Sequence, residues 1–364
     1  MIKITLVAGA RPNFMKIAPI ISAIKKSQAK GIDIQFRLVH TGQHYDKKMS
    51  GDFFEQLNIP EPDTNLEAGG GTQAEQTAAI MVAFEKELMQ NRPTFVLLVG
   101  DVTSTLACSI VAKKLNIDVI HVEGGIRSGD MSMPEEINRI VTDSITDHFF
   151  TTSEIANINL RNVGVEEERI HFVGNTMIDT LYLNKKRFFK PRGSQFEDLK
   201  KGNFIMLTLH RPSNVDNETQ LKAIIETILE NTADFPIIFP VHPRTALNLK
   251  KIAINYERLR MIEPLTYLEF NYLVEQSKGV ITDSGGVTEE ASVMNIPCLT
   301  LRETTERPET IELGTNELVG TNPEKFKPYL INLLSGNWKP YKGIPMWDGK
   351  SAGRIVDKLI QLYS

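Results

Sequence analysis

Short apolar runs alternate with longer amphipathic stretches along the whole chain. The short runs are rich in Val, Ile, Leu and Phe, as is typical of strands whose sheet is buried on both faces. The longer stretches repeat apolar residues with the period of a helix. Strands are expected at 2–7, 34–40, 95–99, 119–122, 148–151, 204–209, 237–240, 260–262, 279–282 and 298–301. Helices are expected between them, for instance at 18–30, 73–90, 103–116 and 219–231.

This alternation predicts an α/β fold of mostly parallel sheets flanked by helices, in which ligands gather beyond the carboxyl ends of the strands. The alternation of strands and helices is interrupted by a basic segment that contains Pro191 and Gly193. This composition favours a solvated connector between domains over a surface that binds nucleic acid. We expect two Rossmann-like domains facing across a cleft. The first covers 1–173 plus 351–364, because the last stretch has the pattern of an amphipathic helix that returns to it, and the second covers 174–350.

The composition narrows the class of protein. The chain has 364 residues, of which 41% are hydrophobic and 24% are charged, with a net charge of −4. These values are typical of a soluble globular protein and predict no nucleic-acid partner. Cys108 and Cys298 lie in apolar segments and are expected to be buried and reduced. No Cys/His spacing predicts a metal, and no apolar run predicts a signal peptide or membrane span, so we expect a cytoplasmic enzyme.

The segment Thr282-Asp283-Ser284-Gly285-Gly286 follows a short apolar strand and opens a helix. Its glycines leave backbone N–H groups open at the positive end of that helix, where an anion binds well. Glu290 lies four residues after Gly286 on the same helical face, where it would accept hydrogen bonds from ribose hydroxyls. The segment predicts a bound nucleoside diphosphate; the alternative is a tight turn with a solvated Glu-Glu pair.

Two cations follow the first predicted strand. Arg11 stands in the glycine turn Gly9-Ala10-Arg11-Pro12, and Lys16 lies about one turn into the helix that begins near Pro12. Both charges suit a diphosphate. The alternative is that they belong to a solvated helix surface.

Three acids are expected on the ligand side of the first domain. Asp101 and Glu123 each follow a predicted strand, and Glu135 shares a helical face with Arg139. Singly, each acid is explained by a helix cap or a surface charge, and a capping box would explain Glu135. Concentrating acids near a pyrophosphate is electrostatically costly, which favours a role in chemistry.

The second half of the chain ends two predicted strands in histidine. His210 precedes Arg211, and the segment Val241-His242-Pro243-Arg244 repeats the pairing of histidine with arginine. A single strand-end histidine is more often structural, but two such pairs on one rim favour contact with an anion. A charged segment containing Arg307 follows the last of the predicted strands. It belongs either to the ligand site or to a solvated loop.

Taken together and in this order, these segments resemble the non-hydrolysing UDP-N-acetylglucosamine 2-epimerases, which have a GT-B-like fold. The motifs that carry the resemblance are Gly9-Ala10-Arg11-Pro12 with Lys16, Thr41-Gly42-Gln43-His44, Gly100-Asp101, His121-Val122-Glu123-Gly124-Gly125-Ile126-Arg127, Pro134-Glu135-Glu136-Ile137-Asn138-Arg139, His210-Arg211, Val241-His242-Pro243, the Thr282–Glu290 segment and Thr304-Thr305-Glu306-Arg307-Pro308-Glu309.

The resemblance implies interconversion of UDP-GlcNAc and UDP-ManNAc through elimination and re-addition of UDP, without a cofactor, by a homodimer. It implies a catalytic group of Asp101, Glu123, Glu135 and His210. It also implies a group of nucleotide contacts: Arg11, Lys16, Arg139, Phe270, Ser284, Gly285, Gly286 and Glu290.

The chain departs from the commonest pattern of this family at Asn13, where many members have Glu, and at Ser213. Tyr45 and Asp46 follow Gln43 and His44, a region that in some members forms a second, activating UDP-GlcNAc site. Activation by substrate and the exact sugar therefore stay open.

Four other functions remain as alternatives: an epimerase for a diacetamido or uronic acid UDP-sugar, a hydrolysing epimerase, a GT-B glycosyltransferase, and a non-catalytic UDP-sugar sensor. The three acids weigh against the glycosyltransferase, which normally needs one base.

Overall fold

The computed structural model describes residues 1–42, 54–232, 235–241, 243–252 and 257–364. The chain forms two compact units, of which unit 1 comprises Met1–Leu183 and Pro345–Ser364, and unit 2 comprises Asn184–Ile344. Each unit is a parallel sheet with helices on both faces, so the predicted α/β class is confirmed.

The described part of unit 1 contains a seven-stranded sheet in the order β3-β2-β1-β4-β5-β6-β7, with every neighbouring pair parallel. Its strands are β1 (Ile2–Ala8), β2 (Ile34–His40), β3 (Thr64–Asn65), β4 (Phe95–Val99), β5 (Asp118–Val122), β6 (His148–Thr151) and β7 (Ile170–Phe172). Its helices are α1 (Arg11–Ala29), α3 (Gln73–Gln90), α4 (Thr103–Lys114), α5 (Pro134–Ile145), α6 (Glu154–Asn162), the 3₁₀ turn η1 (Glu167–Arg169), α7 (Thr176–Asn184) and α16 (Ser351–Tyr363).

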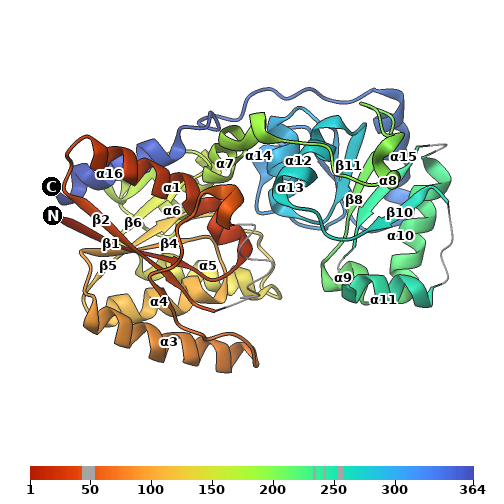
Figure 1. The fold of residues 1–364 in the computed structure, drawn as a ribbon. Helices are drawn as coiled ribbons and strands as arrows, with labels where there is room; N and C mark the ends of the chain where they lie inside the picture. The colour runs from red at the N-terminus through yellow and green to blue at the C-terminus, as the bar shows by residue number, and fades with distance from the viewer. Residues whose placement is uncertain (43–53, 233–234, 242, 253–256) are drawn as a thin grey trace. The chain divides into compact units, whose positions relative to one another are not determined.

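The helices of unit 1 cover its sheet from both sides. Helices α1 and α16 lie side by side on one face, and α3 and α4 pack on the other (Figure 1). Phe84 and Leu88 of α3 are fully buried against this second face together with Val96 and Leu98 of β4. The central strands are buried on both faces, which explains why their sequences are continuous apolar runs.

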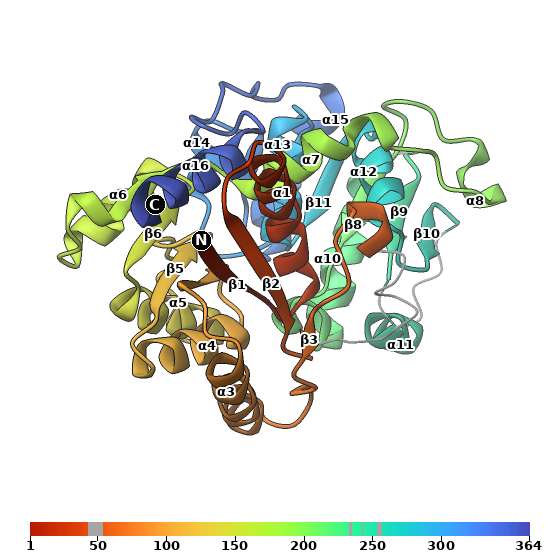
Figure 2. The same cartoon turned by 60° about the vertical axis from the view of Figure 1, so that its left-hand side comes forward.

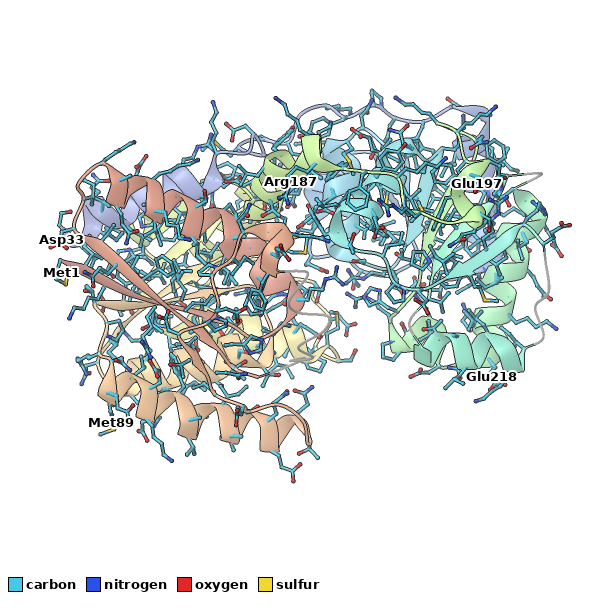
Figure 3. The ribbon with its side chains drawn as sticks, viewed as in Figure 1. Met1, Asp33, Met89, Arg187, Glu197 and Glu218 are labelled. Carbon is cyan, nitrogen blue, oxygen red and sulfur yellow. The ribbon has the colours of Figure 1, made fainter. Side chains whose placement is uncertain are left out.

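The two ends of the described chain lie in unit 1, close to each other (Figure 2). The amino group of Met1 pairs with Asp33 Oδ2 at 3.3 Å, and the two residues stand together beside the first strand (Figure 3). Tyr363, near the carboxyl end, donates its hydroxyl to Asp118 Oδ2 at 2.9 Å. Both termini are therefore tied to the same sheet.

The described part of unit 2 contains a six-stranded parallel sheet in the order β10-β9-β8-β11-β12-β13. Its strands are β8 (Ile205–Thr208), β9 (Ile237–Pro240), β10 (Leu259–Ile262), β11 (Gly279–Thr282), β12 (Cys298–Thr300) and β13 (Asn316–Leu318). Its helices are the 3₁₀ turn η2 (Lys185–Arg187), α8 (Ser194–Glu197), α9 (Pro212–Val215), α10 (Glu218–Asn231), α11 (Pro243–Lys251), α12 (Tyr267–Gln276), α13 (Gly285–Val293), α14 (Pro308–Glu312) and α15 (Pro323–Ser335). One core packs α10 and α15 against the sheet, and a second packs α12 and α13 on its other face.

The boundary between the units lies later than the expected position before Gly174. Helix α7 belongs to unit 1 as far as Leu183, because Thr180 Oγ1 donates to Met15 O at 2.6 Å and Asp179 accepts the backbone N–H groups of Ser351 and Ala352 at 3.1 and 2.7 Å. The segment before α16 also belongs there. Trp347 is buried, and its Nε1 donates to Thr152 O at 2.9 Å.

Candidate functional site

The carboxyl ends of the central strands carry most of the predicted site residues. In unit 1 the strand order reverses between β1 and β4, and in unit 2 it reverses between β8 and β11. Such reversals open a crevice at the carboxyl edge of a parallel sheet, because the two adjoining connections leave in opposite directions. Arg11 and Asp101 follow β1 and β4, and His210 and Ser284 follow β8 and β11. Each unit therefore presents a separate group of chemically active side chains at its reversal.

Glu123 and Lys16 form a buried ion pair in unit 1. Lys16 Nζ lies 2.8 Å from Glu123 Oε1 and 2.7 Å from Oε2, and both side chains are almost completely buried. Glu123 has a φ of 76°, a left-handed conformation that is costly for a residue with a Cβ. Its backbone N–H donates to Phe150 O at 2.8 Å, which helps to hold that conformation. The carboxylate is thus fixed at the end of β5 with a cation beside it.

Asp101 is held by Arg139 of α5. Arg139 Nε and Nη2 donate to Asp101 Oδ2 at 3.0 and 2.6 Å, and Asn138 Nδ2 donates to Asp101 O at 2.8 Å. The Asp101 side chain is 22% exposed, whereas that of Arg139 is only 2% exposed. The carboxylate of Asp101 therefore remains reachable while its cationic partner is enclosed. A direct contact from Arg139 to a nucleotide stays a prediction.

Glu136, which was not among the predicted site residues, holds Arg139 from the other side. Its Oε2 accepts from Arg139 Nη1 at 2.5 Å, and its carboxylate also accepts the backbone N–H groups of Ser128 and Gly129 at 3.0 Å each. Burial alone would raise the pKa of Glu136, but these hydrogen bonds and the Arg139 charge bring that pKa below its ordinary value. Glu135, the predicted catalytic acid, is half-buried one residue earlier at the start of α5.

A buried histidine in unit 1 connects β5 to α5 and to the residue that follows β4. His121 of β5 is fully buried, with Nδ1 2.7 Å from Asp143 Oδ1 and Nε2 2.8 Å from Gly100 O. Asp143 also accepts from Gly125 N at 3.1 Å and pairs with Arg127 Nη1 at 2.6 Å. These contacts hold the residues that flank Asp101 and Glu123 along the chain.

In unit 2, His210 bonds to Asp283, and both residues follow neighbouring strands. His210 Nδ1 lies 2.7 Å from Asp283 Oδ1, the His210 side chain is 57% exposed, and Asp283 is completely buried. Asp283 also accepts from Arg211 N at 2.9 Å and from Asn214 Nδ2 at 3.0 Å. Burial would raise the pKa of Asp283, but His210, the Arg211 N–H and Asn214 together lower it.

The Ser284-Gly285-Gly286 turn begins α13 as expected. Ser284 occupies the N-cap position, but its side chain accepts no capping hydrogen bond in the described structure. A Cβ on Gly285 would lie 2.9 Å from Glu306 Oε1, so the end of the Glu306 side chain would have to shift to admit a larger residue. The first turn of α13 thus presents backbone N–H groups at a positive helix end.

Glu290 is buried in the next turn of α13. Tyr267 of α12 donates its hydroxyl to Glu290 Oε1 at 2.7 Å. Burial raises the pKa of Glu290 to about 7, and repulsion from Glu289 adds to this, although the hydrogen bond from Tyr267 opposes it. A contact from Glu290 to a ribose stays a prediction.

Other predicted contacts lie around α13 or outside the described residues. Arg307 is buried and pairs with Glu289, and Phe270 is half-buried on α12 among the apolar residues that pack beneath α13. Gln43, His44 and His242 lie outside the described residues.

In the part of the chain that the structure describes, no group of three or more His, Cys, Asp or Glu side chains is arranged to hold a metal ion. No described helix is long and apolar enough to span a membrane.

The sequence did not reveal the partners that orient these groups. Asp283, Glu136, Asp143 and Tyr267 were not predicted to act, although all four contact predicted residues or their neighbours. A signal existed for Asp283, because a strand-end aspartate precedes the Ser-Gly-Gly turn. None existed for Tyr267, because its contact depends on how α12 and α13 pack.

The chain as a whole is similar to known proteins. The family model described as UDP-N-acetylglucosamine 2-epimerase matches residues 25–360. A UDP-N-acetylglucosamine 2-epimerase of Methanocaldococcus jannaschii is 43% identical over 97% of this chain and 98% of its own length. A UDP-2,3-diacetamido-2,3-dideoxy-D-glucuronate 2-epimerase of Pseudomonas aeruginosa is 37% identical over 99% of this chain and 100% of its own.

A solved structure extends the similarity to the fold. The crystal structure of the M. jannaschii UDP-GlcNAc 2-epimerase in complex with UDP-GlcNAc and UDP has a TM-score of 0.88 to this chain. The two chains are 42% identical, with 99% of this chain and 100% of that chain covered.

Proposed function

Because the chain belongs to the UDP-N-acetylglucosamine 2-epimerase family, we propose that it interconverts UDP-GlcNAc and UDP-ManNAc. The hydrogen on carbon 2 of the sugar has no adjacent carbonyl, so its direct removal as a proton would leave an unstabilised carbanion. Elimination avoids this. A base takes the carbon 2 proton, the carbon 1–oxygen bond breaks, its electrons leave with UDP, and a carbon 1–carbon 2 double bond forms. Re-addition of UDP to carbon 1, with a proton delivered to the other face of carbon 2, gives the epimer.

The observation that carries this proposal is the pairing of two strand-end carboxylates with buried cations in unit 1. Lys16 holds Glu123 and Arg139 holds Asp101, so both carboxylates have fixed positions. Fixed acids and bases are what a reaction with two proton transfers on opposite faces requires. We assign the proton transfers to Asp101, Glu123 and Glu135, without dividing the two faces among them.

The same reaction needs a group that accepts negative charge as UDP leaves. Unit 2 offers the exposed ring of His210 and the N–H groups at the start of α13. Positive groups that are already in place stabilise a leaving diphosphate without reorganisation during the reaction. We assign His210, Ser284, Gly285 and Gly286 to the diphosphate. Glu290 is assigned to the ribose.

A second candidate is epimerisation of a UDP-2,3-diacetamido-uronic acid, the substrate class named for the P. aeruginosa relative. The chemistry at carbons 1 and 2 is the same for both sugars. They differ at carbons 3 and 6, where the second candidate has an acetamido group and a carboxylate. Parallel assays with both UDP-sugars decide between them, through the ratio of their kcat/KM values.

Incubation with UDP-GlcNAc in D₂O, followed by NMR of the sugar, tests the main proposal. Deuterium at carbon 2 together with UDP-ManNAc supports epimerisation. Release of free ManNAc indicates a hydrolysing enzyme, and binding without exchange indicates a sensor. Transfer of the sugar to an added acceptor indicates a glycosyltransferase.

We also propose that the enzyme is a cytoplasmic homodimer. Exposed apolar side chains on α3 and α5, namely Val82, Met89, Ile137 and Ile140, support self-association. Light scattering after size-exclusion chromatography measures the mass, and a monomer at micromolar concentration contradicts the proposal. Activation through Gln43 and His44 stays a prediction, and a sigmoidal dependence of rate on UDP-GlcNAc would support it.

A further inference from the structure

Asp283 accepts hydrogen bonds from one turn of unit 2 that contains His210. It is fully buried at the end of β11, while the turn follows β8, the neighbouring strand. Asp283 Oδ2 lies 3.0 Å from His210 N, 2.9 Å from Arg211 N and 3.0 Å from Asn214 Nδ2, and Oδ1 faces the imidazole. Donors to the buried carboxylate offset the cost of burying its charge.

The contact of Asp283 to the His210 imidazole differs from its contacts to backbone and amide N–H groups. It determines which ring nitrogen carries a proton as well as where the ring lies. An ionised carboxylate can only accept, so His210 Nδ1 must donate across the 2.7 Å contact. The other ring nitrogen, Nε2, lies on the far side of the ring, and the side chain is 57% exposed. The proton that changes during any reaction is therefore the one on Nε2.

We propose that Asp283 is a positioning residue, which holds His210 as the Nδ1–H tautomer and turns Nε2 toward the departing diphosphate. This inference rests on the proposed function for the identity of the diphosphate. The tautomer itself does not depend on it. A carboxylate behind the ring also stabilises the imidazolium form that would face a developing negative charge.

A purely structural role for Asp283 makes a different prediction. The backbone N–H groups of His210 and Arg211 and the amide of Asn214 would bind the carboxylate even if the ring were absent. In that case, loss of Asp283 would weaken the fold without changing the ring. Asn214 provides the matched control, because it contacts the same carboxylate and also donates to Leu301 O at 3.1 Å, but does not touch the imidazole in the described contacts.

The first test uses the wild-type protein labelled with ¹⁵N in its seven histidines. A spectrum of His210→Gln identifies the His210 signals by their loss. The neutral ring of His210 is expected to carry its proton on Nδ1. A neutral ring protonated on Nε2 overturns the proposal, whether or not the protein turns over any UDP-sugar.

The second test compares Asp283→Asn with Asn214→Ala. In Asp283→Asn the Nδ1–H tautomer is expected to lose its dominance, and kcat is expected to fall by about 10²- to 10³-fold with little change in KM. In Asn214→Ala the tautomer is expected to persist and kcat to stay within about threefold, even if the melting temperature falls. Equal kcat losses in the two variants, or an unchanged tautomer in Asp283→Asn, contradict the proposal.

Discussion

Arg139 donates two hydrogen bonds to one oxygen of Asp101, and the arginine is buried while the aspartate is partly exposed. The guanidinium is planar and offers several donors in a fixed arrangement, so it sets the direction of the carboxylate as well as its position. A lysine has one ammonium group on a flexible stem and does not reproduce this geometry.

Arg139→Lys is therefore expected to lower kcat by about 10- to 100-fold, because small displacements of a reacting group are costly. The measurement is the steady-state rate of UDP-ManNAc formation. Arg161→Lys is the control, since Arg161 forms a surface network with Glu154 and Glu167 and should retain the wild-type rate. A wild-type kcat in Arg139→Lys would mean that the orientation of Asp101 does not limit turnover.

Replacement of the proposed proton-transfer groups should separate chemistry from binding. Asp101→Asn and Glu123→Gln are each expected to lower kcat by about 10²- to 10⁴-fold, because the amides cannot exchange the proton. The affinity for UDP, measured by calorimetry, should change little. Glu61→Gln, at an exposed position, serves as the control. Near-wild-type turnover in either amide variant would remove that residue from the mechanism.

The buried pair of Lys16 and Glu123 predicts a coupled effect on stability. Lys16→Met leaves the Glu123 carboxylate buried without this cation and is expected to lower the free energy of unfolding by about 3–5 kcal/mol. The double variant Lys16→Met/Glu123→Gln should recover part of this loss, because no ionised carboxylate remains. Urea unfolding of the four proteins measures the coupling. Additive losses would show that the two side chains do not stabilise each other.

Glu290 predicts a pH dependence with a defined sign. Its pKa is about 7 in the folded chain and near 4.5 when unfolded, so the folded chain binds more protons between these values. Below pH 4.5 Glu290 is protonated in both states, and its full contribution to the free energy of unfolding is present. That contribution is lost as the pH rises through 7, and the free energy of unfolding falls by up to about 3 kcal/mol. Glu290→Gln should not show this fall. The difference between the two unfolding free energies, followed from pH 5 to 8, isolates Glu290 from the histidines; a constant difference would contradict the prediction.

Alanine substitutions at two glycines of unit 1 distinguish the cost of steric conflict from the cost of backbone strain. Gly125 and Gly129 have φ values of 83° and 72°, so alanine at either position is expected to cost about 1 kcal/mol. At Gly125 an added Cβ would also lie 2.5 Å from Ala156 O, whereas at Gly129 it would meet nothing within 4 Å. Gly125→Ala should therefore lower the melting temperature considerably more than Gly129→Ala. Similar melting temperatures would show that the backbone at Gly125 relaxes.

The sequence predicted long, strongly patterned elements well. The strands at 34–40, 95–99 and 279–282 coincide with β2, β4 and β11, because continuous apolar runs mark strands buried on both faces. The helix at 73–90 coincides with α3, which begins after the Thr72 capping box. Strands β3, β7 and β13 were missed because each has only two or three residues and includes polar ones, whereas the equally short β12 lies in an apolar run.

The site was predictable only in part, for a physical reason. A strand end can be found from local sequence, so Asp101, Glu123 and His210 were placed at the carboxyl edges of their sheets. Their partners depend on packing between distant segments, since Lys16 and Glu123 are 107 residues apart and His210 and Asp283 are 73 apart. Arg139 shows the limit of local reasoning. Helical spacing placed it on one face with Glu135, whereas the structure shows it donating to Glu136 and to Asp101, which lies outside its helix.

The return of α16 to unit 1 has a consequence for synthesis on the ribosome. Unit 2 is continuous in sequence, so its sheet can be completed before residues 345–364 have left the exit tunnel. Unit 1 must wait, because α16 covers α1 and the backbone of Ser351 and Ala352 satisfies the buried Asp179. During that interval the part of α1 that α16 covers is open to water and to chaperones, although unit 1 emerged first.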